Sequence, residues 1–306
     1  MTNPRSPRAD LFVVVGMPRG ATTFLYHNLQ RHPEIFLPAR KEVNYFNIHH
    51  GDGVEWYRDQ YLEAGPHQVK GDISPPCFMD PESPRRILEH DPEARAILVV
   101  RDPVDWALSF YAQFSSFNFV MPSFSEYLDG YRYEMTEGSL GVRFRDGAIV
   151  EAIERFRRAF GDQLLIYDYS HFEHDRLDVL RALESFLGLD PWFASGNFDD
   201  MRINASSRRN AKAVSWLLSR EWFIRAVQRS VPAHVIKSVR GRFDRFNASN
   251  EPGKYVHPER HVVLAEEALA DQRDAIVQLF AAGPIVLGDG TPFSMNTRAE
   301  LAGAGV

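Results

Sequence analysis

The stretch LFVVVGMPRGATT, which occupies residues 11–23, decides the fold. Its first five residues are apolar and end at a glycine, which is typical of a buried parallel strand that leads into a turn. Residues 22–31 follow with Phe24, Leu25 and Leu29 at helical spacing, and they stop before Pro33. The stretch therefore predicts a strand, a glycine-containing loop and a helix.

Similar alternation continues to about residue 190. Further strands are expected at residues 68–72, 95–101 and 163–168, and helices at residues 81–89, 104–114, 148–160 and 176–187. This pattern predicts an α/β fold, namely a P-loop-like three-layer α/β/α arrangement with a central parallel sheet and a helical C-terminal portion. Beyond residue 200, residues 214–227 and 262–280 favour helices and no strong strand follows. No break in composition divides the chain, so we expect a single domain over residues 1–306, with residues 1–10 flexible.

Composition narrows the class of protein. The 306 residues are 44% hydrophobic and 25% charged, which is ample for a packed core and excludes disordered and collagen-like chains. Cys77 is the single cysteine, so an intramolecular disulfide is excluded, and no Cys/His spacing resembles a zinc site. The longest apolar runs are strand-sized, and residues 1–10 lack the apolar stretch of a signal peptide. We therefore expect a cytoplasmic protein without a metal and without a membrane partner.

Charge is unevenly distributed along the chain. The net charge of −6 gives no reason to expect a nucleic-acid partner. Residues 201–245, however, contain eleven basic against two acidic side chains, a local net charge of +9. Such a segment indicates either solvated helix faces or a positive field beside a site for an anion.

Residues 16–23 have the features of an anion-binding loop. A loop between a strand and a helix directs backbone N–H groups and the helix dipole at an anion. Arg19 adds a positive charge, and Thr22 and Thr23 add hydroxyl donors. The loop is not a Walker A motif, because three residues separate Gly16 from Gly20 and the cation precedes the second glycine.

A second motif follows the expected strand at residues 95–101. Arg101 stands at its end, followed by Asp102, and Ser109 comes eight residues after Arg101 on the next expected helix. A nucleotide hydrolase that uses magnesium has a carboxylate at this point, whereas a guanidinium suits an additional phosphate group. Asp102 keeps a metal-using alternative open.

Together these motifs resemble the sulfotransferases that use 3′-phosphoadenosine 5′-phosphosulfate (PAPS). The loop is similar to that family's 5′-phosphosulfate loop, and Arg101 with Ser109 is similar to its 3′-phosphate pair. Residues 41–46 (KEVNYF) and 71–75 (GDISP) also follow the family, and the resemblance covers roughly residues 11–210. The chain departs from the pattern at Ala21, at Asn44, where histidine is frequent, and at Ile73, where heparan-type members often have lysine.

The resemblance implies roles for the residues of the donor site. The residues that it places around PAPS are Gly16, Pro18, Arg19, Gly20, Ala21, Thr22, Thr23, Arg101, Ser109, Tyr167, Arg208, Arg209 and Lys212. Of the last three, one is expected to complete the phosphate site, and the sequence does not say which. Tyr167 either stacks near the adenine or belongs to the core. Residues 200–306 are expected to cover the donor and the acceptor.

The resemblance also implies a catalytic group. Glu42 is the expected general base, Arg19 stabilises the leaving group, and Lys41 orients or contacts the phosphosulfate. From composition alone, an exposed ion pair with Lys41 or Arg40 is the favoured explanation of Glu42. The implied reaction moves a sulfuryl group to a hydroxyl, releases 3′-phosphoadenosine 5′-phosphate (PAP) and needs no metal.

The acceptor site has the weakest signal in the sequence. Asp72, Ser74 and Phe114 are the candidates for contact with a small hydroxylated molecule. Two alternatives remain at this point, a P-loop nucleotide kinase or hydrolase and a nucleotide-binding module without catalysis. The oligomeric state is left open.

Overall fold

The computed structural model describes residues 7–117, 122–135, 138–200 and 257–293, and its centre is a six-stranded sheet in the order β2-β3-β1-β4-β7-β8. Neighbouring strands are parallel except β7 and β8, which are antiparallel. The strands are β1 (Leu11–Gly16), β2 (Ile35–Phe36), β3 (Val69–Ile73), β4 (Arg95–Val100), β7 (Leu164–Asp168) and β8 (Ile285–Leu287). A separate antiparallel hairpin comprises β5 (Tyr131–Met135) and β6 (Gly138–Val142).

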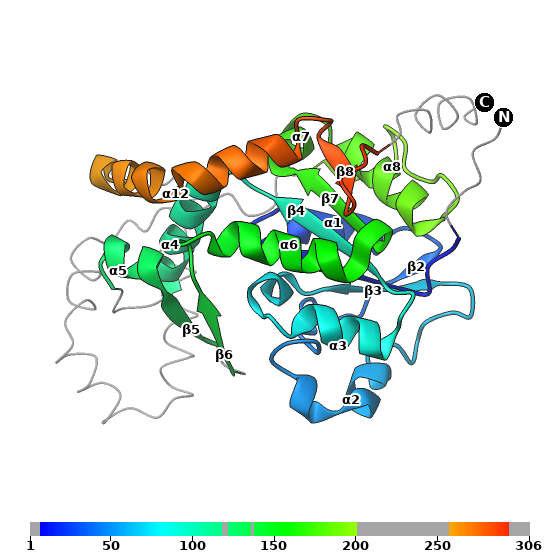
Figure 1. The fold of residues 1–306 in the computed structure, drawn as a ribbon. Helices are drawn as coiled ribbons and strands as arrows, with labels where there is room; N and C mark the ends of the chain where they lie inside the picture. Colours follow the sequence, from blue (N-terminus) through cyan, green and yellow to red (C-terminus); the bar gives the residue numbers. More distant parts are fainter. Residues whose placement is uncertain (1–6, 118–121, 136–137, 201–256, 294–306) are drawn as a thin grey trace, which may run out of the picture.

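Helices cover both faces of the sheet (Figure 1). One face packs against α1 (Thr22–Leu29), α7 (Tyr169–His174) and α8 (Arg176–Leu187). The other face packs against α2 (Val54–Asp59), α3 (Ser83–His90), α4 (Pro103–Phe117), α5 (Phe124–Asp129), α6 (Ala148–Phe160) and α12 (Glu259–Leu279). Three 3-10 turns complete the order: η1 (His50–Asp52), η2 (Pro75–Met79) and η3 (Gly161–Gln163).

The expected three-layer α/β/α fold is confirmed. β1 and β4 are fully buried, because continuous apolar strands lie at the centre of a sheet that is covered on both faces. The alternate residues of β1 enter different cores, with Val13 facing the side of α6 and Val14 facing the side of α1.

No strong strand was expected after residue 200, and the short strand β8 was missed. β8 has only three residues, and it pairs with the outer edge of β7 more than a hundred residues earlier in the chain. Such a strand depends on a distant partner, and so its sequence alone gives little signal. The expected helix at residues 214–227 lies outside the described residues.

The carboxyl ends of the parallel strands meet at one edge of the sheet. β1 lies between β3 and β4, and the three strands end at Gly16, Ile73 and Val100. In α/β proteins, the crevice beyond these ends, where the strand order reverses, is where ligands bind. The residues that the sequence selected in the loop, after β4 and at the end of β3 are therefore brought to one edge.

Candidate functional site at the carboxyl edge of the sheet

The loop after β1 is folded tightly against β4. The N–H of Met17 donates to the carbonyl of Val99 at 2.8 Å, and the N–H of Gly20 donates to the carbonyl of Met17 at 2.9 Å. A Cβ atom on Gly20 would lie 2.2 Å from Cγ1 of Val99, so only glycine fits here. Pro18 is buried, and its carbonyl accepts a hydrogen bond from the indole N–H of Trp106 on α4 at 2.9 Å. The loop therefore has a fixed shape.

The start of α1 faces the same loop. Ala21 is the N-cap residue, and its φ of 57° lies in the left-handed region that favours glycine. Its methyl side chain has no oxygen that could cap the helix. Thr22 is buried and Thr23 is half-buried in the first turn, which contains no acidic residue. The helix start thus presents backbone and hydroxyl donors without a negative charge of its own.

Arg19 and Arg101 lie together beside this helix start. Nη1 of Arg101 donates to the carbonyl of Arg19 at 2.9 Å, and Nε of Arg19 donates to Oγ of Ser109 at 3.4 Å. Burial lowers the pKa of Arg19 below its usual range, and the positive charge of Arg101 lowers it further. The structure thus brings together the three charged or hydroxyl side chains that the sequence selected from two separate motifs.

Arg101 is held by an aromatic ring that the sequence analysis did not select. Its guanidinium carbon lies 4.3 Å from the centre of the Tyr169 ring, a distance that allows a cation–π interaction. Tyr169 is half-buried at the start of α7, directly after β7. Because ligands of α/β proteins bind at the carboxyl ends of the strands, its position after β7 was a signal for Tyr169 in the sequence.

Neither guanidinium forms an ion pair with a carboxylate within the described part of the chain. In addition, Nε of Arg101 is buried and has no hydrogen-bond partner among the described residues. Two adjacent like charges raise the energy of the site, and an unpaired buried donor adds to this cost. A bound dianion would relieve both, because guanidinium groups form charge-assisted bonds to phosphate oxygens.

Asp102 is not available as a metal ligand in this arrangement. Its Oδ1 accepts from the N–H groups of Val104 and Asp105 at 2.9 and 3.1 Å, which caps α4. Its Oδ2 is 2.5 Å from Nε of Arg273 on α12. Among the described residues, no group of three or more His, Cys, Asp and Glu side chains is placed to hold a metal ion.

Lys41 and Glu42 stand on a second segment of the edge. Nζ of Lys41 is 2.7 Å from Oε1 of Glu42, and the Glu42 side chain is 36% exposed. Glu42 has a φ of 61°, and Asn44 two residues later has a φ of 57°, so both lie in the left-handed region. The buried side chain of Val43 lies between them and anchors the segment in the core.

Contacts around η2 place this segment beside the loop. The N–H of Asn44 donates to Oγ of Ser74 at 2.9 Å, and the N–H of Ser74 donates to the carbonyl of Val14 in β1 at 3.1 Å. Gly16 lies against the same turn, since a Cβ atom there would be 3.3 Å from the carbonyl oxygen of Pro75. The Lys41–Glu42 pair and the loop with Arg19 therefore share one edge.

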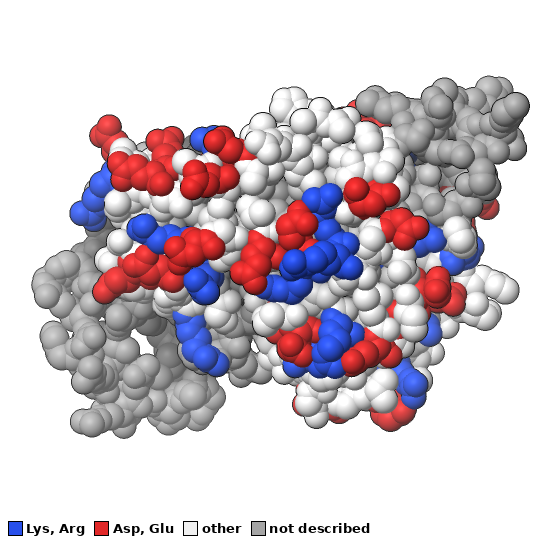
Figure 2. Space-filling model, viewed as in Figure 1, with Lys and Arg blue, Asp and Glu red and all other residues white. Residues whose placement is uncertain are grey.

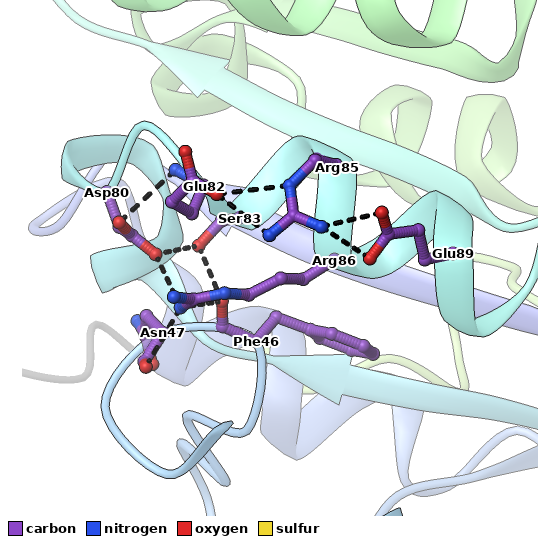
Figure 3. A network of polar contacts seen from close by, with 8 residues as sticks. All are labelled: Phe46, Asn47, Asp80, Glu82, Ser83, Arg85, Arg86 and Glu89. Atoms are coloured by element: carbon purple, nitrogen blue, oxygen red, sulfur yellow. Dashed lines mark hydrogen bonds and ion pairs between the residues drawn. The ribbon is translucent and has the colours of Figure 1, made fainter. Parts of the chain in front are cut away.

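The far end of the segment is attached to α3 (Figure 3). Oγ of Ser83 donates to the carbonyl of Phe46 at 3.0 Å, and Nη1 of Arg86 donates to the carbonyls of Phe46 and Asn47 at 3.2 and 3.3 Å. Asp80 accepts from both Ser83 and Arg86. Glu42 is thus presented on a segment that is held on both sides.

Outside the loop and the start of α1, four of the predicted residues lie in the interior. Asp72 and Ser74 have 0% exposure, Phe114 has 1%, and Tyr167 has 0% with its hydroxyl unpartnered among the described residues. Asp72 and Ser74 lie directly under the Glu42 segment, whereas Phe114 and Tyr167 belong to the two cores on either side of the sheet. The three basic residues Arg208, Arg209 and Lys212 lie outside the described residues.

A tight loop before a helix and two arginines without a carboxylate partner are features of α/β proteins that bind phosphate groups at the edge of a parallel sheet. A family model described as the sulfotransferase domain matches residues 9–226, and the chain belongs to that family. The family resemblance expected from the sequence is thereby confirmed.

Curated relatives agree with this assignment, and a solved structure has a similar fold. The chain is 36% identical over 103 residues to the membrane-associated sulfotransferase kil1 of Dictyostelium discoideum, which covers 33% of the chain and 22% of the relative. It is 28% identical over 178 residues to the heparan sulfate glucosamine 3-O-sulfotransferase 3B1 of Mus musculus, covering 58% and 45%. The chain thus spans less than half the length of these two curated relatives. A sulfotransferase from Alicyclobacillus acidocaldarius has a similar fold, with a TM-score of 0.50, 20% identity, and coverage of 64% of this chain and 87% of that chain.

Proposed function

We propose that this chain is a PAPS-dependent sulfotransferase that transfers a sulfuryl group to a hydroxyl of its acceptor. The observation that supports it most strongly is the pair Arg19 and Arg101, which lie side by side without a carboxylate partner in the described part of the chain. PAPS carries a phosphate group on the 3′ oxygen and another on the 5′ oxygen of its ribose. Two guanidinium groups, of which that of Arg101 has a buried Nε without a partner among the described residues, suit such a ligand.

In this proposal the loop and β4 bind the nucleotide. Backbone donors of the loop and of the start of α1, with the hydroxyls of Thr22 and Thr23, bind the 5′-phosphosulfate. Arg101 and Ser109 bind the 3′-phosphate, and Tyr169 holds the guanidinium of Arg101 in position. Because Tyr167 is fully buried, we assign it to the core rather than to the adenine. One of Arg208, Arg209 and Lys212 remains our candidate for an additional phosphate contact.

The transfer step is an in-line displacement on sulfur. The acceptor oxygen attacks the sulfur while the bond from sulfur to the bridging phosphate oxygen breaks, and PAP leaves with that electron pair. Glu42 takes the proton of the acceptor hydroxyl, and Lys41, 2.7 Å away, orients the carboxylate. Arg19 stabilises the negative charge that grows on the leaving phosphate oxygen.

We propose a small hydroxylated molecule as the acceptor, on the exposed side of Glu42. Asp72, Ser74 and Phe114 are buried, so they have no surface for a direct contact with it. The mouse relative is named for heparan sulfate glucosamine, so a polysaccharide is the competing acceptor. Transfer of label from [35S]PAPS to a panel of phenols and alcohols, with heparan sulfate as a separate arm, distinguishes the two.

None of the described helices is both long and apolar enough to cross a bilayer. We propose that the protein acts in the cytoplasm, and we note that the Dictyostelium relative is described as membrane-associated. Fractionation of cells that express the full chain tests this, because recovery in the membrane pellet would contradict it.

Calorimetry tests the donor site. We expect PAP to bind without added metal and ADP with Mg²⁺ to bind weakly, because the loop and Arg101 suit a 3′-phosphate. Binding of ADP with Mg²⁺ but not of PAP would contradict the proposal and favour a nucleotide kinase or hydrolase. Binding of PAP without transfer to any acceptor would favour a binding module without catalysis.

The substitution Glu42→Gln tests the base. We expect unchanged PAP binding and a turnover lower by about 10²-fold or more, because the amide cannot take the proton. Glu55→Gln is the matched control, since Glu55 is an exposed carboxylate on α2 that pairs with Arg58 at 2.6 Å. Unchanged turnover in Glu42→Gln would place the base elsewhere, with His49 and His50 as the candidates.

A further inference from the structure

We propose that Asp72 is a positioning residue for this reaction, which acts through Ser74 to hold the segment that presents Glu42. The inference rests on the proposed function, because it assigns Asp72 a role in the transfer step. Asp72 has no exposed surface, so it cannot touch the donor or the acceptor itself.

A chain of two hydrogen bonds connects Asp72 to the segment. Oγ of Ser74 donates to Oδ1 of Asp72 at 2.6 Å, which is the length of a bond to an ionised carboxylate. The same Oγ accepts from the backbone N–H of Asn44 at 2.9 Å. Because the Ser74 proton is directed at Asp72, the lone pairs of Oγ are oriented toward Asn44. Asp72 thereby fixes a backbone position two residues from Glu42.

The segment needs such a constraint because its backbone is in a costly conformation. Glu42 and Asn44 have φ angles of 61° and 57°, and residues other than glycine stay in that region only when their surroundings hold them there. Buried side chains of Val43 and Phe46 fix the segment on the core side. The bond from Asn44 to Ser74 fixes its backbone to the end of β3, and this sets the direction in which Glu42 points.

The surroundings of Asp72 make this carboxylate costly to ionise. Burial raises its pKa, the hydroxyl groups of Ser74 and Tyr57 lower it, and the nearby charge of Glu42 raises it, which together leave the pKa at about 6. The hydroxyl of Tyr61 and the thiol of Cys77 also face it, and the charge of Asp72 raises the pKa of both. In the described residues no basic side chain is among the groups that shift its pKa.

The raised pKa of Asp72 makes its ionised form destabilising for the fold. The folded protein binds the Asp72 proton more tightly than the unfolded chain does, so this group lowers the stability of the fold as the pH rises from the ordinary carboxyl range to about 6. Above that pH the penalty is fully present. A residue that served only the fold would be better replaced by a neutral one, which favours a role in function.

Turnover should instead be higher when Asp72 is ionised. Above about pH 6 Asp72 is ionised and accepts strongly from Ser74, whereas below it the neutral carboxyl loses the charge-assisted bond. The Glu42 segment is then held less firmly. We therefore expect turnover to fall as the pH drops through about 6, with little change in PAP binding.

The test uses the full chain with four substitutions. Asp72→Asn removes the charge at nearly constant volume, Ser74→Ala breaks the connection, and Ser74→Thr keeps the hydroxyl. Tyr127→Phe is the matched control, because it deletes a buried hydroxyl that donates to the carbonyl of Ala107 at 3.2 Å and lies outside the connection. The readouts are PAP affinity, transfer from [35S]PAPS to 2-naphthol and to water, amide hydrogen exchange of residues 41–47, and melting temperature across pH 5–8.

We expect Asp72→Asn and Ser74→Ala to lower turnover by about 10-fold at pH 7.5, to speed exchange at residues 41–47 and to leave PAP affinity within about twofold. The double substitution should be no worse than Ser74→Ala alone, since both act through one connection. Asp72→Asn should also melt at a higher temperature than the original protein at pH 7.5 and lose the fall in turnover near pH 6. Ser74→Thr and Tyr127→Phe should retain the exchange pattern and the fall near pH 6.

Three results would overturn the inference: unchanged exchange at residues 41–47 in Asp72→Asn, additive losses in the double substitution, or a fall near pH 6 that persists without Asp72. A failure of the proposed function looks different. In that case the original protein does not bind PAP, whereas the exchange comparison still reports whether Asp72 holds the segment.

Discussion

Arginines occupy two contrasting settings in this protein. On the outer side of α3, Arg85 bonds to Glu82 and Glu89, and Arg86 bonds to Asp80 (Figure 3). The same mixture of basic and acidic side chains covers α3 and α6 on this face of the molecule (Figure 2). At the carboxyl edge of the sheet, Arg101 donates to the carbonyl of Arg19 and lies over the ring of Tyr169. Neither of these two arginines has a carboxylate partner in the described part of the chain.

The comparison distinguishes arginines whose charge is balanced by carboxylates of the protein from arginines whose charge is suited to binding an anionic ligand. An exposed pair such as Arg85 with Glu89 is already neutralised by its neighbour and by water. At the carboxyl edge, burial and then the neighbouring charge of Arg101 lower the pKa of Arg19, and the fold gains nothing from the repulsion between the two guanidinium groups. Substitutions in the two settings should therefore differ in kind, and the following predictions test this in order of decreasing effect.

The largest effect is expected for Arg19→Ala. Because Arg19 is proposed to stabilise the leaving phosphate oxygen, transfer from [35S]PAPS should slow by about 10²–10³-fold, with a smaller loss of PAP affinity. Rates under saturating donor, compared with Arg85→Ala, measure this. A loss confined to PAP affinity would assign Arg19 to binding alone.

Arg101→Ala should weaken PAP binding by about 10- to 100-fold, because a charged hydrogen-bonding partner of the 3′-phosphate is removed. Binding of 5′-AMP, which lacks that phosphate, should change little. Calorimetry with both ligands measures the discrimination. Equal weakening of both would mean that Arg101 does not recognise the 3′-phosphate.

Tyr169→Leu should have a smaller effect of the same kind. Loss of the ring under the guanidinium removes a contact of about 0.5–2 kcal/mol, so PAP should bind about 2- to 30-fold less tightly. Tyr169→Phe retains the ring and should bind PAP as the original protein does. A loss in the phenylalanine variant would show that the hydroxyl matters instead.

Arg85→Ala should have almost no effect on ligands. The side chain is 55% exposed, so loss of its two ion pairs should leave the melting temperature nearly unchanged. PAP affinity should stay unchanged. A marked loss of PAP affinity would remove the distinction between the two groups of arginines.

The sequence predicted the elements whose signal is local. β1 and β4 were expected within a residue or two of their ends, because a fully buried central strand must be continuously apolar. The family resemblance placed Arg19 and Ser109 around the same ligand, and the structure brings Nε of Arg19 to 3.4 Å from Oγ of Ser109. β8 and the β5–β6 hairpin were missed, because their pairing partners rather than their composition define them.

Side-chain direction was the main limit for the site. Tyr167 and Tyr169 are two residues apart at the end of β7, yet the first lies within the strand and enters the core while the second starts a helix beside Arg101. Asp72 and Ser74 were selected from the sequence as candidates for contact with the acceptor, and only the fold shows that both are buried beneath the segment with Glu42. The left-handed backbone at Glu42 gave no signal in the sequence.

The ion pair between Asp102 and Arg273 bears on how the protein should be produced. The family match ends at residue 226, whereas Arg273 belongs to α12, which packs along α4 and reaches the residue next to Arg101. An expression fragment trimmed to the matched segment would lose this helix and uncover part of the apolar surface of α4. The smallest fragment worth crystallising with PAP therefore extends through β8, well past the boundary that family similarity suggests.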